Sequence, residues 1–501
     1  MITIIKNMQQ VVLLILCFLA ISCKPELDIK NTRALVIPEN PDSVNEFNVY
    51  LYPDDIQEKQ DATARFNAYL ENDNVVISGE VYDEQVFVNN EKVFSSDRVE
   101  IYLSSFRGST NRLRYIILPP GEKNEAKVIV HDWRTSREAR LKIPPINASA
   151  ELIEKGYRFK AVVPLSELGE HSSRKKHFGM QMVVADADGG NEELQFSSWF
   201  HVNRLHMNTL ACYQMKVGSN VSPDFKHGVK GNIEHDTLFL KIQHDENHLE
   251  VRYADTIIYL TSSSPEVIKI HLQDPFITGE ITKNGETIDY FDSRLMNRTD
   301  IINSPPYRYE QDIVYFEAMG DYFGYAKNNT LFIGSSSIRE WYTLPDDFSG
   351  QIVYNRGFGG SIAAEALWFA ERIVIPAKPS KIVYFEGDND IAMGIPVADI
   401  IHNVKGFIDI VTDRLPGTEI YLLSVKPSIA RRHLMHESIS FNQKLDSLAA
   451  TYEHVTYIDI FLSMMQKNGN IREDIWQSDS LHMNDTGYAI WAEEIGRFIT
   501  R

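Results

Sequence analysis

Two residues near the end of the chain have the types and spacing needed for proton transfer. In QSDSLHMNDTGYAIW (477–491), Asp479 stands three positions before His482, just ahead of a helical pattern. An imidazole can act as a general base near neutral pH, and a neighbouring carboxylate can fix its tautomer and stabilise its charged form. The same residues could simply cap the helix. The pair therefore indicates catalysis only if the chain also supplies a nucleophile and an oxyanion hole.

A candidate nucleophile lies in LFIGSSSIREW (331–341). This stretch runs from an apolar strand pattern through a glycine into three consecutive serines, Ser335, Ser336 and Ser337, and then into a helical pattern. Backbone N–H groups at a helix start have no partner within the helix and can hold developing negative charge. A serine-rich helix cap explains the same pattern, so the motif alone does not indicate catalysis.

Two further turns could supply hydrogen-bond donors. In VYNRGFGGSIAAEA (353–366), a glycine-rich turn lets a ligand approach the backbone N–H groups closely. The stretch does not form the dinucleotide fingerprint, because Ile362 stands in the place of its third glycine. In VYFEGDNDIAMG (383–394), Asn389 offers a side-chain N–H, although Gly, Asp and Asn also suit an ordinary turn.

The elements that position these motifs alternate between strands and amphipathic helices from about residue 308. The expected strands are TLFIG, QIVYN, SKIVYFEG, EIYLLSV and VTYIDI. This alternation predicts a parallel sheet covered on both faces, with functional residues at the carboxyl ends of its strands. The clearest helix, VADIIHNVKGFIDIV (397–411), places its apolar residues on one stripe: Val397, Ile400, Ile401, Val404, Phe407, Ile408 and Val411.

In their order along the chain, these motifs resemble the SGNH (GDSL-like) hydrolase superfamily over about 309–501. GSSSIR, NRGFGGS, GDNDIA, SVKPS and LHMNDTGYAIW are especially close to one esterase subgroup. By this resemblance Ser336 matches the nucleophile, His482 the base and Asp479 its orienting carboxylate. The N–H groups of Ser336 and Gly360 and the side chain of Asn389 match the oxyanion hole. The resemblance implies a three-layer, flavodoxin-like α/β domain with five parallel strands, and ester hydrolysis without a metal or organic cofactor.

The chain departs from the Gly-Asp-Ser form of that family, because Ser335 replaces the Asp. Ser335 and Ser337 therefore remain rivals for the role of nucleophile. The GxSxG elbow of α/β-hydrolases is absent, since Ile338 stands where its second glycine would be.

The chain before residue 305 is rich in short strand patterns separated by turns, which predicts a β-sandwich. In RVEIYLS, Val99, Ile101 and Leu103 share one face. Residues from about 30 to 220 resemble family 9 carbohydrate-binding modules through NVVISGEVYD, SSDRVEIYLS, YRFKAVVPLSELG and MQMVVADADGG. A second β-rich stretch, ending in NSPPY, is expected to form a small module or linker domain.

Two features of the predicted sandwich could bind ligands. Trp133 and Trp199 are the candidate glycan-binding aromatics, although a core or edge position is favoured for both. Asp186 and Asp188 in DADGG (186–190) could hold calcium, but the run lacks the glycine of an EF-hand loop and a hairpin turn is favoured.

The N-terminus indicates export. Its apolar run, VVLLILCFLAI, follows Lys6 and is too short to span a bilayer as a mature helix, which predicts a signal peptide. FLAISC resembles a bacterial lipobox, although Leu19 stands one position early. By that resemblance Cys23 becomes the lipidated first residue of an exported bacterial lipoprotein, anchored in the membrane in the periplasm or on the cell surface. An ordinary secretory signal is the alternative. With Cys17 removed and Cys23 lipidated, Cys212 has no partner for a disulfide.

We therefore expect a signal peptide (1–22), a carbohydrate-binding-module-like β-sandwich (23–225), a small β-rich module (226–305) and an SGNH hydrolase domain (306–501). The net charge of −19 argues against nucleic acid as a partner. The expected function is hydrolysis of short acyl esters, O-acetyl above all, on a polysaccharide or glycan. The alternatives are a lipid or lysophospholipid esterase and a non-catalytic, glycan-binding surface lipoprotein.

Overall fold

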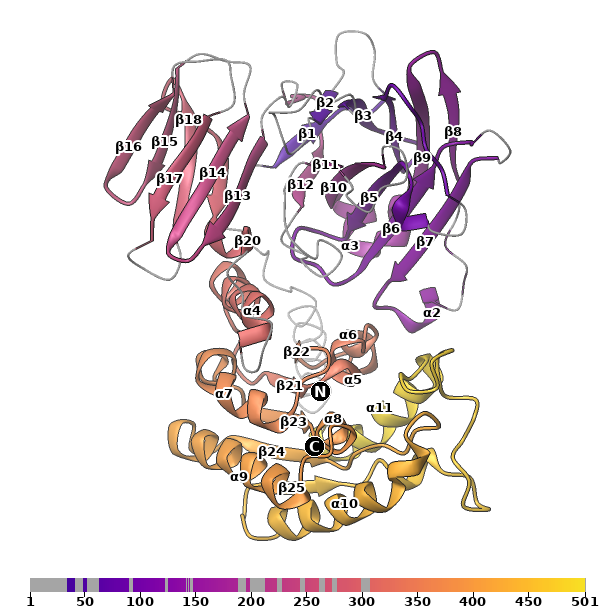
Figure 1. Cartoon of the computed structure of the whole chain (residues 1–501), viewed down its shortest axis with the longest axis vertical. Coiled ribbons are helices and arrows are strands. Elements are labelled where there is room, and N and C mark those ends of the chain that lie inside the picture. Colours follow the sequence, from indigo (N-terminus) through magenta and orange to yellow (C-terminus); the bar gives the residue numbers. More distant parts are fainter. Residues whose placement is uncertain are drawn as a thin grey trace, which may run out of the picture.

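Three groups of elements follow one another along the chain: a β-sandwich, a smaller β module and an α/β domain (Figure 1). The computed structural model describes residues 34–40, 48–51, 63–89, 93–121, 125–140, 142, 144, 147–187, 195–198, 212–222, 228–243, 248–260, 266–272, 277–298 and 307–500. The expected signal peptide (1–22), Cys23, Asp188 and Trp199 lie outside these residues. Among the described helices, none is long and apolar enough to cross a membrane.

The α/β domain is built on a five-stranded sheet in which every pair of neighbours is parallel, with the order β22-β21-β23-β24-β25. This confirms the predicted sheet and all five of its strands. The first strand of the domain lies inside the sheet, so the chain winds outward from it in both directions, as in flavodoxin-like folds. The strands are β21 (Thr330–Gly334), β22 (Val353–Gly357), β23 (Lys381–Phe385), β24 (Glu419–Leu423) and β25 (Val455–Ile458).

Helices cover both faces of this sheet, because alternate strand residues point to opposite sides. Leu331 and Ile333 of β21 pack in a core with α4, α7, α9 and α10, whereas Phe332 packs in another with α5, α6 and α11. The apolar stripe predicted for α9 is confirmed, since its residues pack into the first of these cores. The helices are α4 (Glu310–Phe323), α5 (Ser336–Arg339), α6 (Leu344–Asp347), α7 (Ala363–Ile373), α8 (Asp388–Ala392), α9 (Val397–Arg414), α10 (Met435–Ala449) and α11 (Asp485–Ile499).

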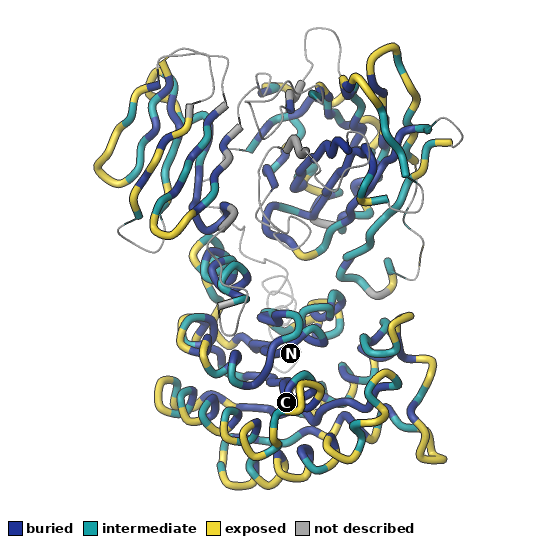
Figure 2. The backbone as a smooth tube through the Cα atoms, in the orientation of Figure 1, coloured by how far each residue is buried: buried dark blue, intermediate teal, exposed yellow. Residues whose placement is uncertain are grey.

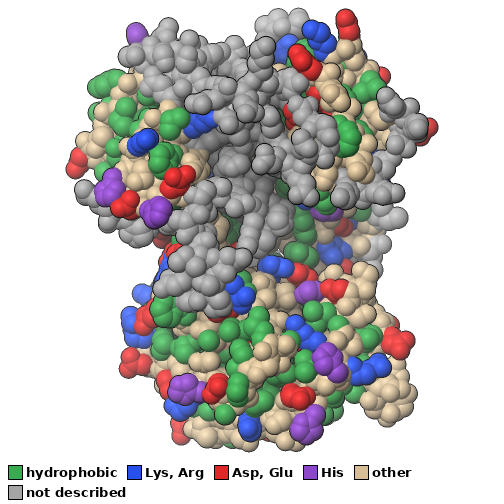
Figure 3. Space-filling view, viewed as in Figure 1, with side chains coloured by type: hydrophobic (Ala, Val, Ile, Leu, Met, Phe, Trp, Pro, Cys, Tyr) green, Lys and Arg blue, Asp and Glu red, His purple; other side chains and the backbone are tan. Residues whose placement is uncertain are grey.

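Burial follows this layering. The inner strands β21, β23 and β24 are almost wholly buried, the edge strands β22 and β25 are partly exposed, and the outer sides of the helices are exposed (Figure 2). On the face of the α/β domain seen in Figure 3, basic, acidic and hydrophobic side chains are interspersed. On that face the excess of acidic residues is not gathered into one patch.

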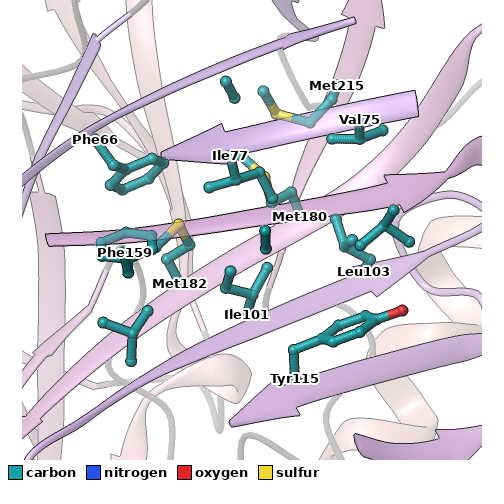
Figure 4. Packing of buried hydrophobic residues seen from close by; sticks show 14 of the residues in the cluster. Phe66, Val75, Ile77, Ile101, Leu103, Tyr115, Phe159, Met180, Met182 and Met215 are labelled. Atoms are coloured by element: carbon teal, nitrogen blue, oxygen red, sulfur yellow. The ribbon is translucent and has the colours of Figure 1, made fainter. Parts of the chain in front are cut away.

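The β-sandwich consists of two sheets with the orders β1-β12-β10-β5-β6-β7, with β11 beside β10, and β2-β3-β4-β9-β8. Val99, Ile101 and Leu103 share one face, as predicted, and are fully buried between the sheets together with residues such as Phe66 and Phe159 from the other sheet (Figure 4). The strands are β1 (Leu35–Ile37), β2 (Asn48–Leu51), β3 (Thr63–Glu71), β4 (Asn74–Tyr82), β5 (Arg98–Ser104), β6 (Arg112–Leu118), β7 (Lys127–Trp133), β8 (Ala148–Ile153), β9 (Gly156–Pro164), β10 (His177–Asp186), β11 (Gln195–Ser198) and β12 (Tyr213–Val217); the helices are α2 (Arg137–Arg140) and α3 (Glu170–Lys175).

The smaller module has two four-stranded sheets, β17-β14-β13-β20 and β16-β15-β18-β19, around one core of its own. The Tyr213 hydroxyl of the sandwich donates to Asp289 of the module (3.0 Å), and Arg294 of the module pairs with Asp321 of α4. The module therefore contacts both neighbours. Its strands are β13 (Gly228–Glu234), β14 (Thr237–Gln243), β15 (Leu249–Tyr253), β16 (Thr256–Leu260), β17 (Glu266–His271), β18 (Thr278–Lys283), β19 (Glu286–Asp292) and β20 (Asn297–Arg298).

Candidate active site

The three consecutive serines lie in a sharp turn from β21 into α5. Gly334 ends the strand at φ 154°, and a Cβ on it would lie 2.2 Å from the carbonyl oxygen of Phe385 on the neighbouring strand. Only glycine fits so close a backbone approach. Ser335 and Ser337 are each 2% exposed, whereas Ser336 is only half-buried. Of the three hydroxyls, that of Ser336 is the most accessible.

Ser336, His482 and Asp479 form a chain of hydrogen bonds. The Nε2 atom of His482 lies 2.9 Å from the Ser336 hydroxyl, and its Nδ1 atom lies 2.5 Å from Oδ2 of Asp479. Because the carboxylate can only accept, Nδ1 carries the proton of the neutral ring and Nε2 is left to accept from the serine. The fold thus brings together side chains that are 146 residues apart in the sequence.

A tight turn holds Asp479 beside His482. The second carboxylate oxygen, Oδ1, accepts from the backbone N–H groups of Leu481 and His482, both at 2.9 Å. Ser480 takes a left-handed φ of 59° to close the turn. Partial burial favours the neutral carboxyl, but hydrogen bonds from His482 and from these two N–H groups outweigh it and lower the pKa of Asp479 to about 2. The carboxylate is therefore ionised at neutral pH.

The three expected oxyanion donors lie in turns at the same edge of the sheet. Ser336 begins α5, and Gly360 (φ 86°) lies in the turn after β22. Among the described residues, neither of their N–H groups has a hydrogen-bond partner. Asn389 lies beside the glycine turn, since its Nδ2 donates to the carbonyl of Ser361 (2.9 Å), and its second N–H remains available.

The glycine turn is held from two sides. The Tyr309 hydroxyl donates to the carbonyl of Gly359 (3.0 Å), and Arg308 donates to that of Gly360 (3.3 Å). Below the turn, the hydroxyl of the fully buried Ser361 donates to Glu386 (2.6 Å). These contacts fix the carbonyl groups of the turn and so the direction of its N–H groups.

The sequence patterns did not reveal these supporting residues. Tyr309 and Arg308 precede the first expected strand, and Glu386 looks like the end of a buried strand. A carboxylate directly after an otherwise apolar strand was the available signal for Glu386, because such a group needs a buried partner.

In the sandwich, Trp133 lies at the end of β7 with one ring face covered. The guanidinium of its cross-strand partner Arg112 lies 4.6 Å from the ring centroid, and His131 contacts the ring edge-on at 5.7 Å between centroids. Trp133 is thus half-buried rather than an open stacking platform. Trp199, the other candidate, lies outside the described residues.

Asp186 is close to acidic residues that are distant in the sequence. Its carboxylate oxygens and those of Asp83 and Asp97 lie within 4.8 Å of one another, and all three residues are buried. Burial is the main cause that raises the pKa of Asp97 to about 8. Carboxylates at this spacing could hold a divalent cation, whereas the sequence favoured a hairpin turn here; Asp188, the other carboxylate considered for calcium, lies outside the described residues.

Two family matches divide the chain in the same way as its fold. Residues 331–490 match the GDSL-like Lipase/Acylhydrolase family, and residues 42–209 match the Carbohydrate family 9 binding domain-like family. The chain carries a GDSL-like acylhydrolase domain. It follows a β-sandwich of the carbohydrate family 9 binding type, so both expected resemblances are confirmed. No curated protein matches the chain.

Solved structures similar to each part are known at low sequence identity. A GDSL-like lipase from Bacteroides thetaiotaomicron is 21% identical, over 34% of this chain and 88% of that one, with a TM-score of 0.31. A catalytic mutant of an acetylxylan esterase from Geobacillus stearothermophilus is 14% identical, over 35% and 95%, with a TM-score of 0.31. A family 9 carbohydrate-binding module from Caldicellulosiruptor kristjanssonii, in complex with cellotriose, is 15% identical, over 38% and 98%, with a TM-score of 0.28.

Proposed function

We propose that the acylhydrolase domain is a serine esterase that removes short acyl groups, O-acetyl above all, from carbohydrate. The observation that carries the catalytic part is the hydrogen-bond chain from Ser336 through His482 to Asp479. Its order and its tautomer are those of a nucleophile, a general base and an orienting carboxylate. The three donors at the same edge of the sheet supply a matching oxyanion hole.

In the proposed reaction, the Ser336 hydroxyl attacks the ester carbonyl carbon while its proton passes to Nε2 of His482. The carbonyl oxygen becomes an oxyanion, stabilised by the N–H groups of Ser336 and Gly360 and by Asn389. His482 then gives the proton to the departing alcohol as the carbon–oxygen bond breaks, which leaves an acyl group on Ser336. Water attacks this ester in turn, loses its proton to His482 and releases the acid, and the proton returns to Ser336.

Carbohydrate as the substrate is supported by the domain pairing, since the acylhydrolase domain follows a domain of the carbohydrate family 9 binding type. This support comes from analogy and not from site chemistry. A lipid or lysophospholipid esterase would use the same residues on a longer acyl chain. A non-catalytic glycan-binding protein would not need the Ser336–His482–Asp479 chain at all.

Hydrolysis of p-nitrophenyl acetate, butyrate and octanoate by the wild type and by Ser336→Ala tests the proposal. We expect activity that falls with acyl length and that Ser336→Ala lowers on the order of 10⁴-fold or more. Ser335→Ala and Ser337→Ala are the matched controls, and loss in either of them with a surviving Ser336→Ala would identify a different nucleophile. Turnover of long-chain lipid esters equal to that of acetylated sugars would contradict the carbohydrate assignment.

The proposal also includes export as a lipoprotein lipidated at Cys23, for which the N-terminal sequence is the support. Radiolabelled palmitate should enter the wild type but not Cys23→Ala in a bacterial host. Equal labelling of both proteins would contradict the anchor.

A further inference from the structure

The loop that follows β24, residues 424–431, contacts two parts of the proposed active site. Arg431 donates from Nη2 to Oδ1 of Asn389 at 2.9 Å. The backbone N–H of Ala430, the residue before it, donates to the carbonyl of Ser480 at 3.1 Å. Ser480 lies between Asp479 and His482, so one short segment touches both the Asn389 donor and the turn that carries the base.

The contacts of Asn389 determine which end of its amide faces the glycine turn. A guanidinium can only donate and a carbonyl can only accept. Rotating the amide by half a turn would place Nδ2 against Arg431 and Oδ1 against the carbonyl of Ser361. Both hydrogen bonds would be lost, and like partial charges would meet in a partly buried position. Arg431 and Ser361 therefore select the same orientation, with Nδ2 toward the glycine turn.

Arg431 is itself held in place by a buried ion pair. Its Nη1 lies 2.7 Å from Oδ1 of Asp388, and the other oxygen of that carboxylate lies 2.6 Å from Nζ of Lys426. Burial favours the neutral form of Asp388, but the two cations outweigh it and lower its pKa. A planar guanidinium can donate to Asp388 and Asn389 at once in fixed geometry, which a single ammonium group cannot do.

We propose that Arg431 is a positioning residue of the active site, which holds Asn389 in the one amide orientation that can donate to an oxyanion. This inference rests on the proposed esterase function. Arg431 acts through Asn389 and not on the ester itself. Its loss should weaken an interaction made in the transition state, and so lower kcat more than it changes KM.

A double-mutant cycle on the full chain, with p-nitrophenyl acetate as substrate, tests the proposal. We expect Arg431→Met to lower kcat roughly 10- to 100-fold with KM changed by about 2-fold or less, because it removes the support of one oxyanion donor. In the Asn389→Ala background, the same change should lower kcat by no more than about 3-fold, since the group it supports is already absent. Arg431→Lys should restore part of the rate. Arg432→Met, an exposed arginine one residue along, is the matched control and should leave kcat unchanged.

The proposal would be overturned if Arg431→Met lowered kcat by the same factor in the wild type and in the Asn389→Ala background. A change in KM with kcat unaltered would overturn it as well. If Arg431→Met does not give the wild-type circular dichroism spectrum, Arg431→Lys replaces it in the cycle. If the wild type hydrolyses no ester at all, the proposed function fails, and crystal structures decide the inference separately. An Asn389 side chain in Arg431→Met that has left the Ser361 carbonyl would support it, and an unmoved one would overturn it.

Discussion

Arg140 of the β-sandwich forms an ion pair with Asp485 of the acylhydrolase domain, with 3.0 Å between Nε and Oδ2. Asp485 is the first residue of α11, and His482 lies three residues before it. The same guanidinium lies over the ring of Tyr342, 5.7 Å from its centroid. The sandwich therefore contacts the catalytic domain beside the turn that carries the proposed base.

We expect Arg140→Met to loosen this contact. The pair is partly exposed, so its loss should lower the free energy of unfolding by about 0.5–1 kcal/mol and the midpoint of thermal unfolding by about 1–4 °C. Asp485→Asn should lower it further, because a carboxylate in the first turn of α11 also interacts favourably with the helix dipole. Scanning calorimetry measures both. Glu138→Gln, which breaks the exposed ion pair between Glu138 of α2 and Lys142, is the control, and an equal drop there would contradict the prediction.

The Asp479 carboxylate should contribute to stability only above acidic pH. Its pKa of about 2 in the folded chain lies below the ordinary value of 3.8. Its contribution is therefore present above about pH 4 and is lost as the pH falls through about 2. In Asp479→Asn this contribution is absent at every pH, so the variant should lose less stability than the wild type between about pH 5 and pH 2. The midpoint of thermal unfolding of both proteins, measured at several pH values across that range, tests this prediction. An equal fall of both midpoints would contradict it.

At Gly334 the backbones of β21 and β23 lie too close together to leave room for a side chain. In Gly334→Ala the new Cβ would meet the carbonyl of Phe385 at 2.2 Å, in a left-handed backbone conformation. We expect the free energy of unfolding to fall by on the order of 3 kcal/mol or more, and the turn that carries Ser336 to be displaced. Gly496→Ala is the matched control: its Cβ would meet nothing within 4 Å inside α11, and the change should stabilise by about 0.5–1 kcal/mol. Urea unfolding measures the expected loss of stability in Gly334→Ala and the expected gain in Gly496→Ala.

The sequence predicted the parts of this structure that local periodicity determines. The apolar stripe of α9 and the five strands of the parallel sheet follow from side-chain spacing alone. In each element the spacing of the apolar residues determines which side chains are buried. The Ser336–His482–Asp479 set came from the resemblance of the ordered motifs to the SGNH superfamily, and the strand ends of a parallel sheet, which meet at one edge, explain why such motifs can come together.

Contacts between loops distant in the sequence were not predictable in this way. Arg431 reaches Asn389 across 42 residues, and nothing in either stretch encodes that contact. Asp186 meets Asp83 and Asp97, whereas the sequence suggested its neighbour Asp188. Likewise, Trp133 is covered by a cross-strand arginine because the pairing register of β6 and β7 places Arg112 opposite it. Each of these contacts depends on the packing of complete elements.

Glu386 is a buried carboxyl that should destabilise the fold when ionised. It is 2% exposed, accepts from the Ser361 hydroxyl through Oε1, and its Oε2 has no hydrogen-bond partner. Burial, followed by the charge of Asp390, raises its pKa well above the ordinary value of 4.5. The neutral form is therefore preferred in the folded chain, and stability is lost as the pH rises above about 4.

We accordingly expect Glu386→Gln to be more stable than the wild type at about pH 8 and to differ little from it at about pH 4.5. The glutamine keeps the oxygen that accepts from Ser361 and cannot ionise. Urea unfolding at both pH values measures the difference, with Glu453→Gln, an exposed glutamate, as the control for a change of net charge. A Glu386→Gln variant whose stability relative to the wild type is the same at both pH values would show that Glu386 does not resist ionisation in the folded chain.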